Sequence, residues 1–315
     1  MRIAAIDFGG TAVKLGVFES RRMVAAEEAP IVGGRVDLEA VARRLDVLLE
    51  GHRPDFAGIA VPGIIDPTGT RLLAAHGKYG DLHDVDLSAW SVEQFGCGAA
   101  VENDARAALI GEVADGSARG ARDAALIVLG TGIGTAAVVD GRVVRGSHGH
   151  GGILGGHVTV DVSGPRCACG NIGCAEAIAS TWALSADAKA GRLALGPVLS
   201  ERLSVAGSIG IRDLIETREE PESASLLDRY IAVWAAAVVT HCHAFDPEVI
   251  VVTGGVMRSA GVILPALRGI VHQNLWSSSY RPRFVVPEAP STSVLRGIAA
   301  LAADMDSDNT NEGRQ

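Results

Sequence analysis

The stretch RIAAIDFGGTAVKLGVFE, residues 2–19, contains two apolar runs separated by an acidic residue and two glycines. Such runs favour β-strands, and Phe8-Gly9-Gly10 is typical of the turn that joins them. A second stretch, ALIVLGTGIGTAAVVDGRVVRG at residues 125–146, has the same order of strand, glycine-rich turn and strand. The repetition predicts two structurally similar halves.

Helical and strand patterns alternate along the rest of the chain. Apolar residues recur at helical spacing between Asp37 and Gly51, which predicts a helix there. Further strands are expected at residues 57–63, 99–104 and 248–252, and further helices at 105–113, from about 175, and at 226–244. This alternation predicts an α/β fold in which helices cover both faces of a sheet.

The length of the chain, 315 residues, is long for one core and comfortable for two. We expect an N-terminal α/β domain at residues 1–115, joined by the last helix at about 292–303. A C-terminal α/β domain is expected at residues 116–291. The final residues are polar and follow no pattern, so residues 304–315 are expected to be disordered.

The charge of the protein limits its partners. The formal net charge is −9, and no cluster of Lys and Arg appears, which argues against a nucleic-acid surface. The longest apolar run, at residues 231–239, is too short for a membrane span. Asp7 comes too early for a signal peptide, so we expect a cytoplasmic protein in which cysteines stay reduced.

Two glycine-rich turns are candidates for phosphate binding. In DFGGT, Gly9 and Gly10 let backbone N–H groups approach an anion, Thr11 adds a hydroxyl, and Asp7 is suited to hold Mg²⁺ through water. The alternative is a plain hairpin turn. GTGIG, at residues 130–134, repeats this chemistry, and because it enters a strand it is not a dinucleotide fingerprint. A third turn, Gly254-Gly255, either lies against a nucleotide or simply joins a strand to a helix.

Asp104 ends a strand and begins a helix in the sequence Glu102-Asn103-Asp104. It is either the N-terminal cap of that helix or a general base that accepts a proton from a substrate hydroxyl. A position at the N-terminus of a helix favours the ionised form that a base requires. The local sequence by itself favours the cap.

Three cysteines and one histidine lie close together in HVTVDVSGPRCACGNIGCAE, residues 157–176. His157, Cys167, Cys169 and Cys174 form a Cys₃His set that suits tetrahedral Zn²⁺. Four protein ligands leave no position for water, so the expected zinc is structural. The other two cysteines, Cys97 and Cys242, are expected to be small buried residues.

These motifs together resemble those of the ROK family of sugar kinases and related repressors. The resemblance lies in DFGGT from Asp7, END from Glu102, GTGIG from Gly130, and Gly156-His157 followed by CACGNIGCAE, and it extends from residue 1 to about 300. It implies an actin-like ATPase or hexokinase-type fold, with two α/β domains around a cleft, often as a homodimer. It also implies transfer of the γ-phosphoryl group of ATP to a sugar hydroxyl.

The resemblance assigns roles to individual residues. Asp104 becomes the catalytic base, and this assignment replaces the cap favoured by the local sequence. ATP and Mg²⁺ are assigned to Asp7, Gly9, Gly10, Thr11, Lys14, Gly130, Thr131, Gly132, Gly134, Gly254 and Gly255. The sugar is assigned to Gly63, Asn103, Asp104, Leu154, His157 and Glu176.

One position departs from the family pattern. Family kinases typically have GExGH before the cysteines, whereas Leu154 stands at the position of that Glu. A leucine cannot accept a hydrogen bond, and an unpaired buried hydroxyl costs about 1–3 kcal/mol, so a different sugar preference is expected. In the loop at residues 74–87, near the place where family members have an Asn-containing sugar loop, His76 or Lys78 is either a recognition residue or simply solvated.

The leading hypothesis is therefore an ATP- and Mg²⁺-dependent sugar kinase with a structural zinc. A second hypothesis, motivated by Leu154, is a sugar-binding protein with weakened catalysis. A third is a sugar-responsive repressor of the same family. Such repressors carry a helix-turn-helix before DxGGT, and because the motif begins at Asp7 none is expected here.

Overall fold

The structure, a computed structural model, describes residues 1–10, 12–31, 37–75, 79–83 and 85–312, with backbone alone for 305–312. The chain divides into two compact units. The first contains residues 1–120, 143–151 and 287–315, and the second contains residues 121–142 and 152–286. The domain bounds expected from the sequence stay a prediction, and the first unit takes in residues 143–151, which no sequence pattern indicates.

The first unit is built on a five-stranded sheet with the order β3-β2-β1-β4-β7. The hairpin predicted from residues 2–19 supplies its antiparallel part, because Arg2 to Phe8 of one strand pair in register with Glu19 to Val13 of the next. β3 also pairs antiparallel with β2, whereas β4 and β7 extend the sheet from β1 in parallel. The strands are β1 (Arg2–Phe8), β2 (Ala12–Glu19), β3 (Arg22–Pro30), β4 (Phe56–Val61) and β7 (Ala99–Asn103), beside a small hairpin of β5 (Ile64–Ile65) and β6 (Leu72–Ala74).

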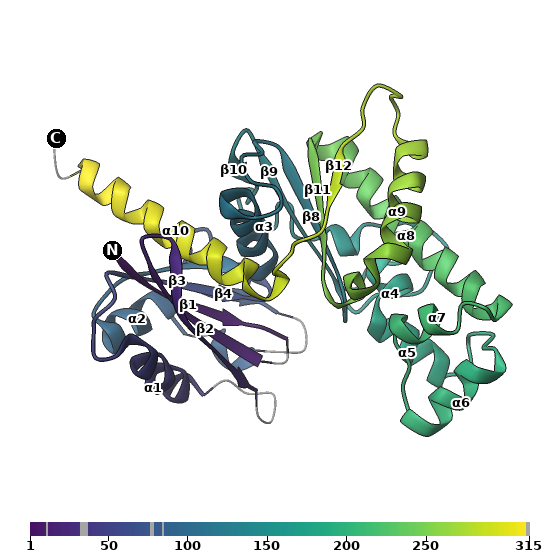
Figure 1. The fold of residues 1–315 in the computed structure, drawn as a ribbon, viewed down its shortest axis with the longest axis horizontal. Helices are drawn as coiled ribbons and strands as arrows, with labels where there is room; N and C mark the ends of the chain where they lie inside the picture. Colours follow the sequence, from purple (N-terminus) through teal and green to yellow (C-terminus); the bar gives the residue numbers. More distant parts are fainter. Residues whose placement is uncertain (11, 32–36, 76–78, 84, 313–315) are drawn as a thin grey trace. The chain divides into compact units, whose positions relative to one another are not determined.

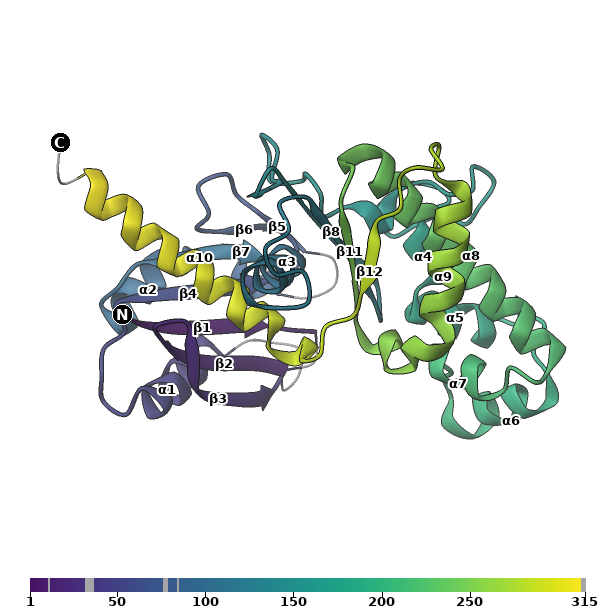
Figure 2. The ribbon, with the colours of Figure 1, turned by 45° about the horizontal axis from the view of Figure 1, so that its top comes forward.

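Helices cover this sheet on two faces (Figures 1 and 2). One face packs Leu45 and Leu49 of the first helix with Trp90 and Phe95 of the second, and the other face packs Ile298 of the last helix. The predicted helix after Asp37 is confirmed, and the Asp37 side chain caps it. The helices are α1 (Leu38–Leu49), η1 (Gly80–Leu82), α2 (Leu87–Phe95), α3 (Asp104–Asp115) and α10 (Pro290–Glu312).

The second unit repeats the plan of the first. Its sheet has the order β10-β9-β8-β11-β12, again a hairpin followed by parallel strands. The repetition predicted from the two glycine-turn hairpins is therefore confirmed. Its strands are β8 (Ala124–Leu129), β9 (Ile133–Val139), β10 (Arg142–Val143, at the junction of the units), β11 (Val249–Thr253) and β12 (Arg283–Val285).

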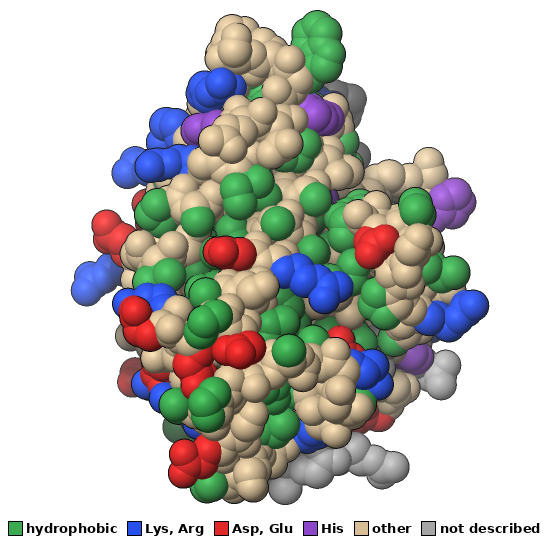
Figure 3. All heavy atoms as spheres, turned by 90° about the vertical axis from the view of Figure 1, so that its right-hand side faces the viewer, with side chains coloured by type: hydrophobic (Ala, Val, Ile, Leu, Met, Phe, Trp, Pro, Cys, Tyr) green, Lys and Arg blue, Asp and Glu red, His purple; other side chains and the backbone are tan. Residues whose placement is uncertain are grey.

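The core of the second unit lies around one long helix, whose buried side chains include Tyr230 and Trp234. On the face drawn in Figure 3, apolar side chains are dispersed among charged ones. No helix of the described residues is long and apolar enough to cross a membrane. The helices are η2 (Gly155–His157), α4 (Ala175–Ala179), α5 (Thr181–Lys189), α6 (Pro197–Ala206), α7 (Ile211–Glu216), α8 (Pro221–Phe245), η3 (Gly255–Ser259) and α9 (Ala260–Asn274).

The last helix, α10, extends through much of the tail that was expected to be disordered. Its backbone is helical to Glu312, whereas disorder was expected from residue 304. The reason is that neither Gly nor Pro occurs between residues 298 and 312 to end the helix that packs on the sheet.

Helices α3 and α10 cross at two glycines. A Cβ atom on Gly297 would lie 1.7 Å from the carbonyl oxygen of Ala107, and one on Gly111 would lie 2.1 Å from that of Ser293. The buried Glu112 joins the same helices, because it accepts hydrogen bonds from Ser293 Oγ and from Arg296 Nη2. This crossing holds α3, and with it Asp104, against the rest of the first unit.

We predict that Gly297→Ala lowers the free energy of unfolding by about 3 kcal/mol or more, because the new methyl group meets a backbone oxygen that cannot move alone. Gly269→Ala is the matched control, since Gly269 lies inside α9 with open space at its Cβ position. That change should stabilise the protein slightly, by about 0.5–1 kcal/mol. Denaturant unfolding measures both, and equal effects of the two variants would contradict the close crossing.

Candidate active site and metal centre

Two acidic residues lie near the carboxyl ends of strands in the first unit. Asp7, near the end of β1, is 2% exposed and pairs across the hairpin with Lys14, whose Nζ lies 3.5 Å from its Oδ2. Burial raises the pKa of Asp7 to about 6, although the charge of Lys14 opposes this shift. Asp7 and Lys14, both predicted to hold nucleotide and Mg²⁺, are thus in contact.

Asn103, not Asp104, caps helix α3. Its Oδ1 accepts hydrogen bonds from the N–H groups of Ala105 and Arg106 at 3.0 and 3.1 Å. Its Nδ2 donates to the carbonyl oxygen of Gly63 at 2.9 Å and to Asp104 Oδ1 at 3.1 Å. The local interpretation of Asp104 as the cap is therefore wrong, since the preceding residue has the extended backbone that a cap needs.

Asp104 occupies the first helical position, where its Oδ1 accepts the N–H of Ala105 at 2.8 Å. Burial, followed by the negative charge of Asp7, raises its pKa to about 7. The helix N-terminus was expected to keep this carboxylate ionised. The structure corrects that expectation, because desolvation outweighs the hydrogen bonds that favour the charged form.

The DFGGT turn uses part of its hydrogen-bonding capacity internally. The N–H of Gly9 donates to the carbonyl oxygens of Asp7 and Ala12, both at 3.0 Å. The hydroxyl of Tyr79 donates to the carbonyl oxygen of Gly9. Gly10 follows in the described chain, whereas Thr11 lies outside the described residues, as do His76 and Lys78.

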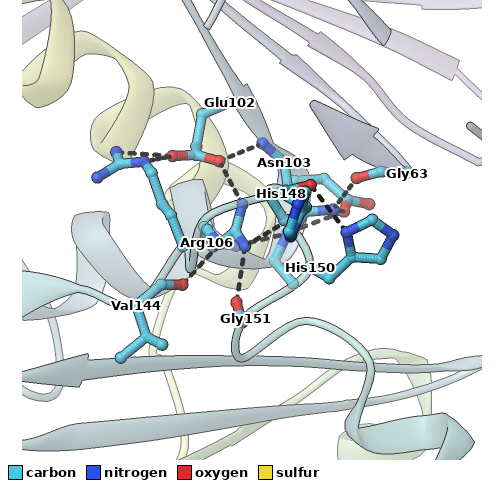
Figure 4. A network of polar contacts seen from close by, with 12 residues as sticks. Gly63, Glu102, Asn103, Arg106, Val144, His148, His150 and Gly151 are labelled. Carbon is cyan, nitrogen blue, oxygen red and sulfur yellow. Dashed lines mark hydrogen bonds and ion pairs between the residues drawn. The ribbon is translucent and has the colours of Figure 1, made fainter. Parts of the chain in front are cut away.

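The strand and helix that meet at Asn103 carry a buried ion pair that the sequence does not indicate (Figure 4). Arg106 is 1% exposed, and its Nη1 lies 3.1 Å from Oε1 of Glu102, which is 2% exposed. The other oxygen of Glu102 pairs with Arg145 Nη2 at 2.7 Å. Nothing in the spacing of Glu102 and Arg106 separates this pair from an ordinary helix-surface pair.

The same arginine holds the segment that returns to the first unit at residues 143–151. Its Nε donates to the carbonyl oxygen of Val144 at 3.0 Å, and its Nη2 donates to those of Gly149 and Gly151 at 2.8 and 2.6 Å. All three nitrogens of Arg106 are therefore hydrogen-bonded, which is how a buried guanidinium is tolerated. Arg106 fixes this segment to the start of the helix that carries Asp104.

In the second unit, the GTGIG turn and Glu176 are in direct contact. Glu176 Oε2 accepts the N–H of Ile133 at 2.8 Å, and a Cβ atom on Gly132 would lie 2.5 Å from the same oxygen. The N–H of Gly130 is bonded to the carbonyl oxygen of Gly132. Gly134 lies inside β9, so only Gly130, Thr131 and Gly132 form the turn. The turn therefore offers fewer backbone donors than its five-residue motif suggests.

Gly254, at the end of β11, is required by the packing of the chain. Its φ is +99°, and a Cβ atom there would lie 2.3 Å from the carbonyl oxygen of Leu129. This contact places Gly254 against the residue that precedes the GTGIG turn. The Cβ position of Gly255, by contrast, is open. The predicted nucleotide role of both glycines stays a prediction.

The predicted zinc ligands come together. His157 Nδ1 lies 3.6 Å from Cys167 Sγ, and the sulfur atoms of Cys169 and Cys174 are 3.7 Å apart. All four ligand atoms lie within 4.8 Å of one another. The edge of a tetrahedron with zinc–sulfur bonds of about 2.3 Å is about 3.8 Å, so the set fits tetrahedral Zn²⁺.

Leu154 lies next to this cluster in the chain. It precedes η2, and its carbonyl oxygen accepts the N–H of His157 at 2.9 Å. Its side chain is 39% exposed, which leaves its apolar surface available to a ligand. The N–H of Gly155 is fixed by Thr135 Oγ1, and Thr135 in turn donates to the carbonyl oxygen of Gly152. The segment before the cluster is thus held in place by strand β9.

The two units have five-stranded sheets with the same strand arrangement, and each sheet has a glycine turn in its hairpin. This is an actin-like ATPase fold. The chain belongs to the ROK family, because the family model matches residues 3–305. A glucokinase from Thermotoga maritima is 30% identical over 277 residues, which cover 85% of this chain and 86% of the relative.

Solved structures agree with this assignment. A ROK hexokinase from Thermus thermophilus has a TM-score of 0.79 and 28% identity, covering 98% of this chain and 100% of that chain. A ROK family glucokinase from Streptomyces griseus, in complex with glucose and AMPPNP, has a TM-score of 0.77 and 25% identity. That match covers 96% of this chain and 100% of that chain.

Proposed function

We propose that this ROK protein is an ATP-dependent sugar kinase in which Asp104 is the general base. The kinase class rests on the family and on the glucokinase and hexokinase relatives. The observation that supports the base is the geometry of Asp104, whose carboxyl lies at the start of α3. The side-chain amide of Asn103 donates to its Oδ1 and orients the carboxyl, and the same oxygen accepts the N–H of Ala105 in the first turn. Its raised pKa of about 7 suits a group that takes up a proton near neutral pH.

In this proposal the ionised Asp104 accepts the proton of a sugar hydroxyl as that oxygen attacks the γ-phosphorus of ATP. The bond from the γ-phosphorus to the β,γ-bridging oxygen breaks, and ADP leaves. Mg²⁺, when bound, neutralises charge on the phosphates, and the buried Asp7 is the carboxylate suited to hold it through water. Lys14, opposite Asp7, adds a positive charge at the same strand end.

Glu176 is the first of the proposed sugar contacts. Glu176 uses Oε2 to fix Ile133, and its Oε1, which has no partner among the described residues, is an acceptor for a sugar hydroxyl. His157 and Asn103 are the further proposed contacts, and Gly63 holds Asn103. Leu154 replaces an acceptor with apolar surface, so we propose a sugar that lacks the hydroxyl there or carries an acyl group. A homodimer stays a prediction.

The pH dependence of catalysis follows from the raised pKa of Asp104. We expect kcat/KM for the sugar to rise with pH and to level off above an apparent pKa of about 7, because only the ionised carboxylate accepts the proton. Steady-state kinetics at saturating ATP and Mg²⁺ between about pH 5.5 and 8.5 give the profile. A flat profile through this range would argue against a base with a raised pKa.

A zinc ion in the His157–Cys174 cluster is proposed to be structural. We expect Cys169→Ser to lose zinc and to melt at a lower temperature, because three ligands hold the metal less tightly than four. Cys97→Ser is the control, since Cys97 is buried against Ser91 and away from the cluster. Elemental analysis gives the zinc content. Equal zinc in Cys169→Ser and in the wild type would remove this residue from the ligand set.

The experiment that tests the function is an ADP-release screen over hexoses, N-acetylhexosamines, ketoses and polyols, with ATP and polyphosphate as donors. Sugar-dependent ADP formation is the expected result, with a preference that differs from plain glucose. If sugars bind but no donor is consumed, Leu154 instead marks a sugar-binding protein with weakened catalysis. That outcome would also favour the alternative hypothesis of a sugar-responsive regulator without enzyme activity.

A further inference from the structure

A cavity in the first unit lies at the opposite end of β1 from Asp7. It has a volume of about 200 Å³, and it is bounded by β1, β2, the end of α3 and α10. Ile3, Phe18 and Ala299 form an apolar wall, and all three are at least 95% buried. The cavity is therefore closed on one side by the core and is separate from the residues assigned to catalysis.

Three arginines line the same cavity. Arg296 donates through Nη2 to Glu112 at 2.9 Å, while its Nε is buried without a partner among the described residues. The side chains of Arg21 and Arg119, both exposed, form no hydrogen bond or ion pair with the residues that the structure describes. Glu112 thus holds Arg296 in place, and the guanidinium donors that remain free for a ligand are those of Arg21 and Arg119.

The charge of the cavity selects among anions. Asp115 also lines it, so three positive groups face one negative group in the wall, in addition to the Glu112 carboxylate already paired with Arg296. Three arginines and two carboxylates, those of Asp115 and Glu112, leave a net charge of +1 around the cavity, which favours a monoanion over a phosphate dianion. The apolar wall requires a ligand body without hydroxyl groups, because a buried hydroxyl would find no partner on Ile3 or Phe18.

We propose that this cavity binds a small apolar monocarboxylate, with the carboxylate on the arginines and the hydrocarbon against Ile3, Phe18 and Ala299. A planar carboxylate matches the fork of donors that a guanidinium presents. A chain of about six carbons fits a space of about 200 Å³. The ligand would not compete with sugar or nucleotide, since Asp7 and Asp104 lie at the other ends of β1 and α3.

Isothermal titration calorimetry of the full chain with hexanoate tests the proposal. We expect a dissociation constant on the order of 0.1–1 mM, with 1-hexanol at least about tenfold weaker and inorganic phosphate unable to displace hexanoate. Arg119→Ala and Arg21→Gly should each weaken hexanoate by about threefold to tenfold. Glycine is chosen at Arg21 because its φ of +73° suits glycine without strain.

Two further variants separate a specific site from general affinity. Ala300→Leu, which places a larger apolar side chain in the cavity wall without removing a charge, should abolish hexanoate binding. Arg268→Ala, an exposed arginine on α9, removes the same charge elsewhere and should leave the titration unchanged. Equal affinity for hexanol and hexanoate, displacement by phosphate, or unaltered binding by Ala300→Leu would each overturn the proposal. Because Asp104→Asn should still bind hexanoate, the test is independent of kinase activity.

Discussion

Replacing Asp104 with Asn is expected to lower sugar-dependent turnover by about 10²–10⁴-fold while leaving the fold intact. The amide is nearly isosteric with the carboxyl and keeps an oxygen that accepts the N–H of Ala105 and the amide of Asn103. It cannot take up a proton from a hydroxyl near neutral pH. The loss should therefore appear in kcat, with a smaller change in KM for the sugar.

The difference in stability between this variant and the wild type is expected to depend on pH. The pKa of Asp104 rises from 3.8 to about 7 in the folded protein, so between about pH 4 and 7 the native state binds more protons than the unfolded state. The contribution of Asp104 to the stability of the wild type consequently falls as the pH rises through this range and changes little above it. Asp104→Asn has no carboxyl to ionise in the folded protein, so it avoids this loss of stability. The variant should be more stable than the wild type at pH 8 but not at pH 4.

Asp46→Asn is the matched control, because Asp46 is an exposed aspartate on α1. It should change neither turnover nor the pH dependence of unfolding. Thermal unfolding at pH 4 and at pH 8, together with ADP release, measures all three proteins. An Asp104→Asn variant that keeps full activity would remove the base assignment, and one that is less stable than the wild type at pH 8 would contradict the buried-carboxyl account.

Replacing Arg106 with Met is expected to lower the free energy of unfolding strongly. The change leaves the buried Glu102 with only Arg145 as a charged partner and removes the donor to the carbonyl oxygens of Val144, Gly149 and Gly151. Breaking a buried pair from one side typically costs about 3–5 kcal/mol, and the remaining Arg145 points to the lower end of that range. Denaturant unfolding at neutral pH measures the change.

Two comparisons identify the cause of that loss. Glu102→Leu combined with Arg106→Met should be more stable than Arg106→Met alone, because the double change leaves no buried charge. Arg122→Met removes an arginine whose ion pair with Asp140 is fully exposed, and it should leave the unfolding midpoint unchanged. If Arg106→Met behaves like Arg122→Met, the network of Figure 4 does not support the start of α3.

The sequence predicted the features that depend on local chemistry. Glycine turns between apolar strands indicated both hairpins, and the spacing of Cys167, Cys169 and Cys174 indicated a ligand cluster that the structure brings within 4.8 Å. Asp104 was identified as a candidate base from its place at the end of a strand. The hairpins and the ligand cluster were predictable because turns and metal ligands are decided by residues within a few positions of one another, whereas the role of Asp104 as the base stays a prediction.

Features that depend on distant parts of the chain were not predictable from local patterns. Residues 143–151 join the first unit because Arg106 binds their carbonyl groups, and carbonyl acceptors leave no trace in the sequence. The raised pKa of Asp104 comes from burial and from Asp7, which is far away in the chain. The cap at Asn103 was missed because an Asp at the next position is an equally good capping residue.

The most direct test of the kinase assignment is the stoichiometry of the reaction. The wild-type protein, incubated with ATP, Mg²⁺ and the best sugar of the screen, should produce ADP and a sugar phosphate in equal amounts, as followed by ³¹P NMR. Omitting the sugar should stop ADP formation. Release of inorganic phosphate without sugar, or binding of sugars with no transfer from any donor, would contradict the account.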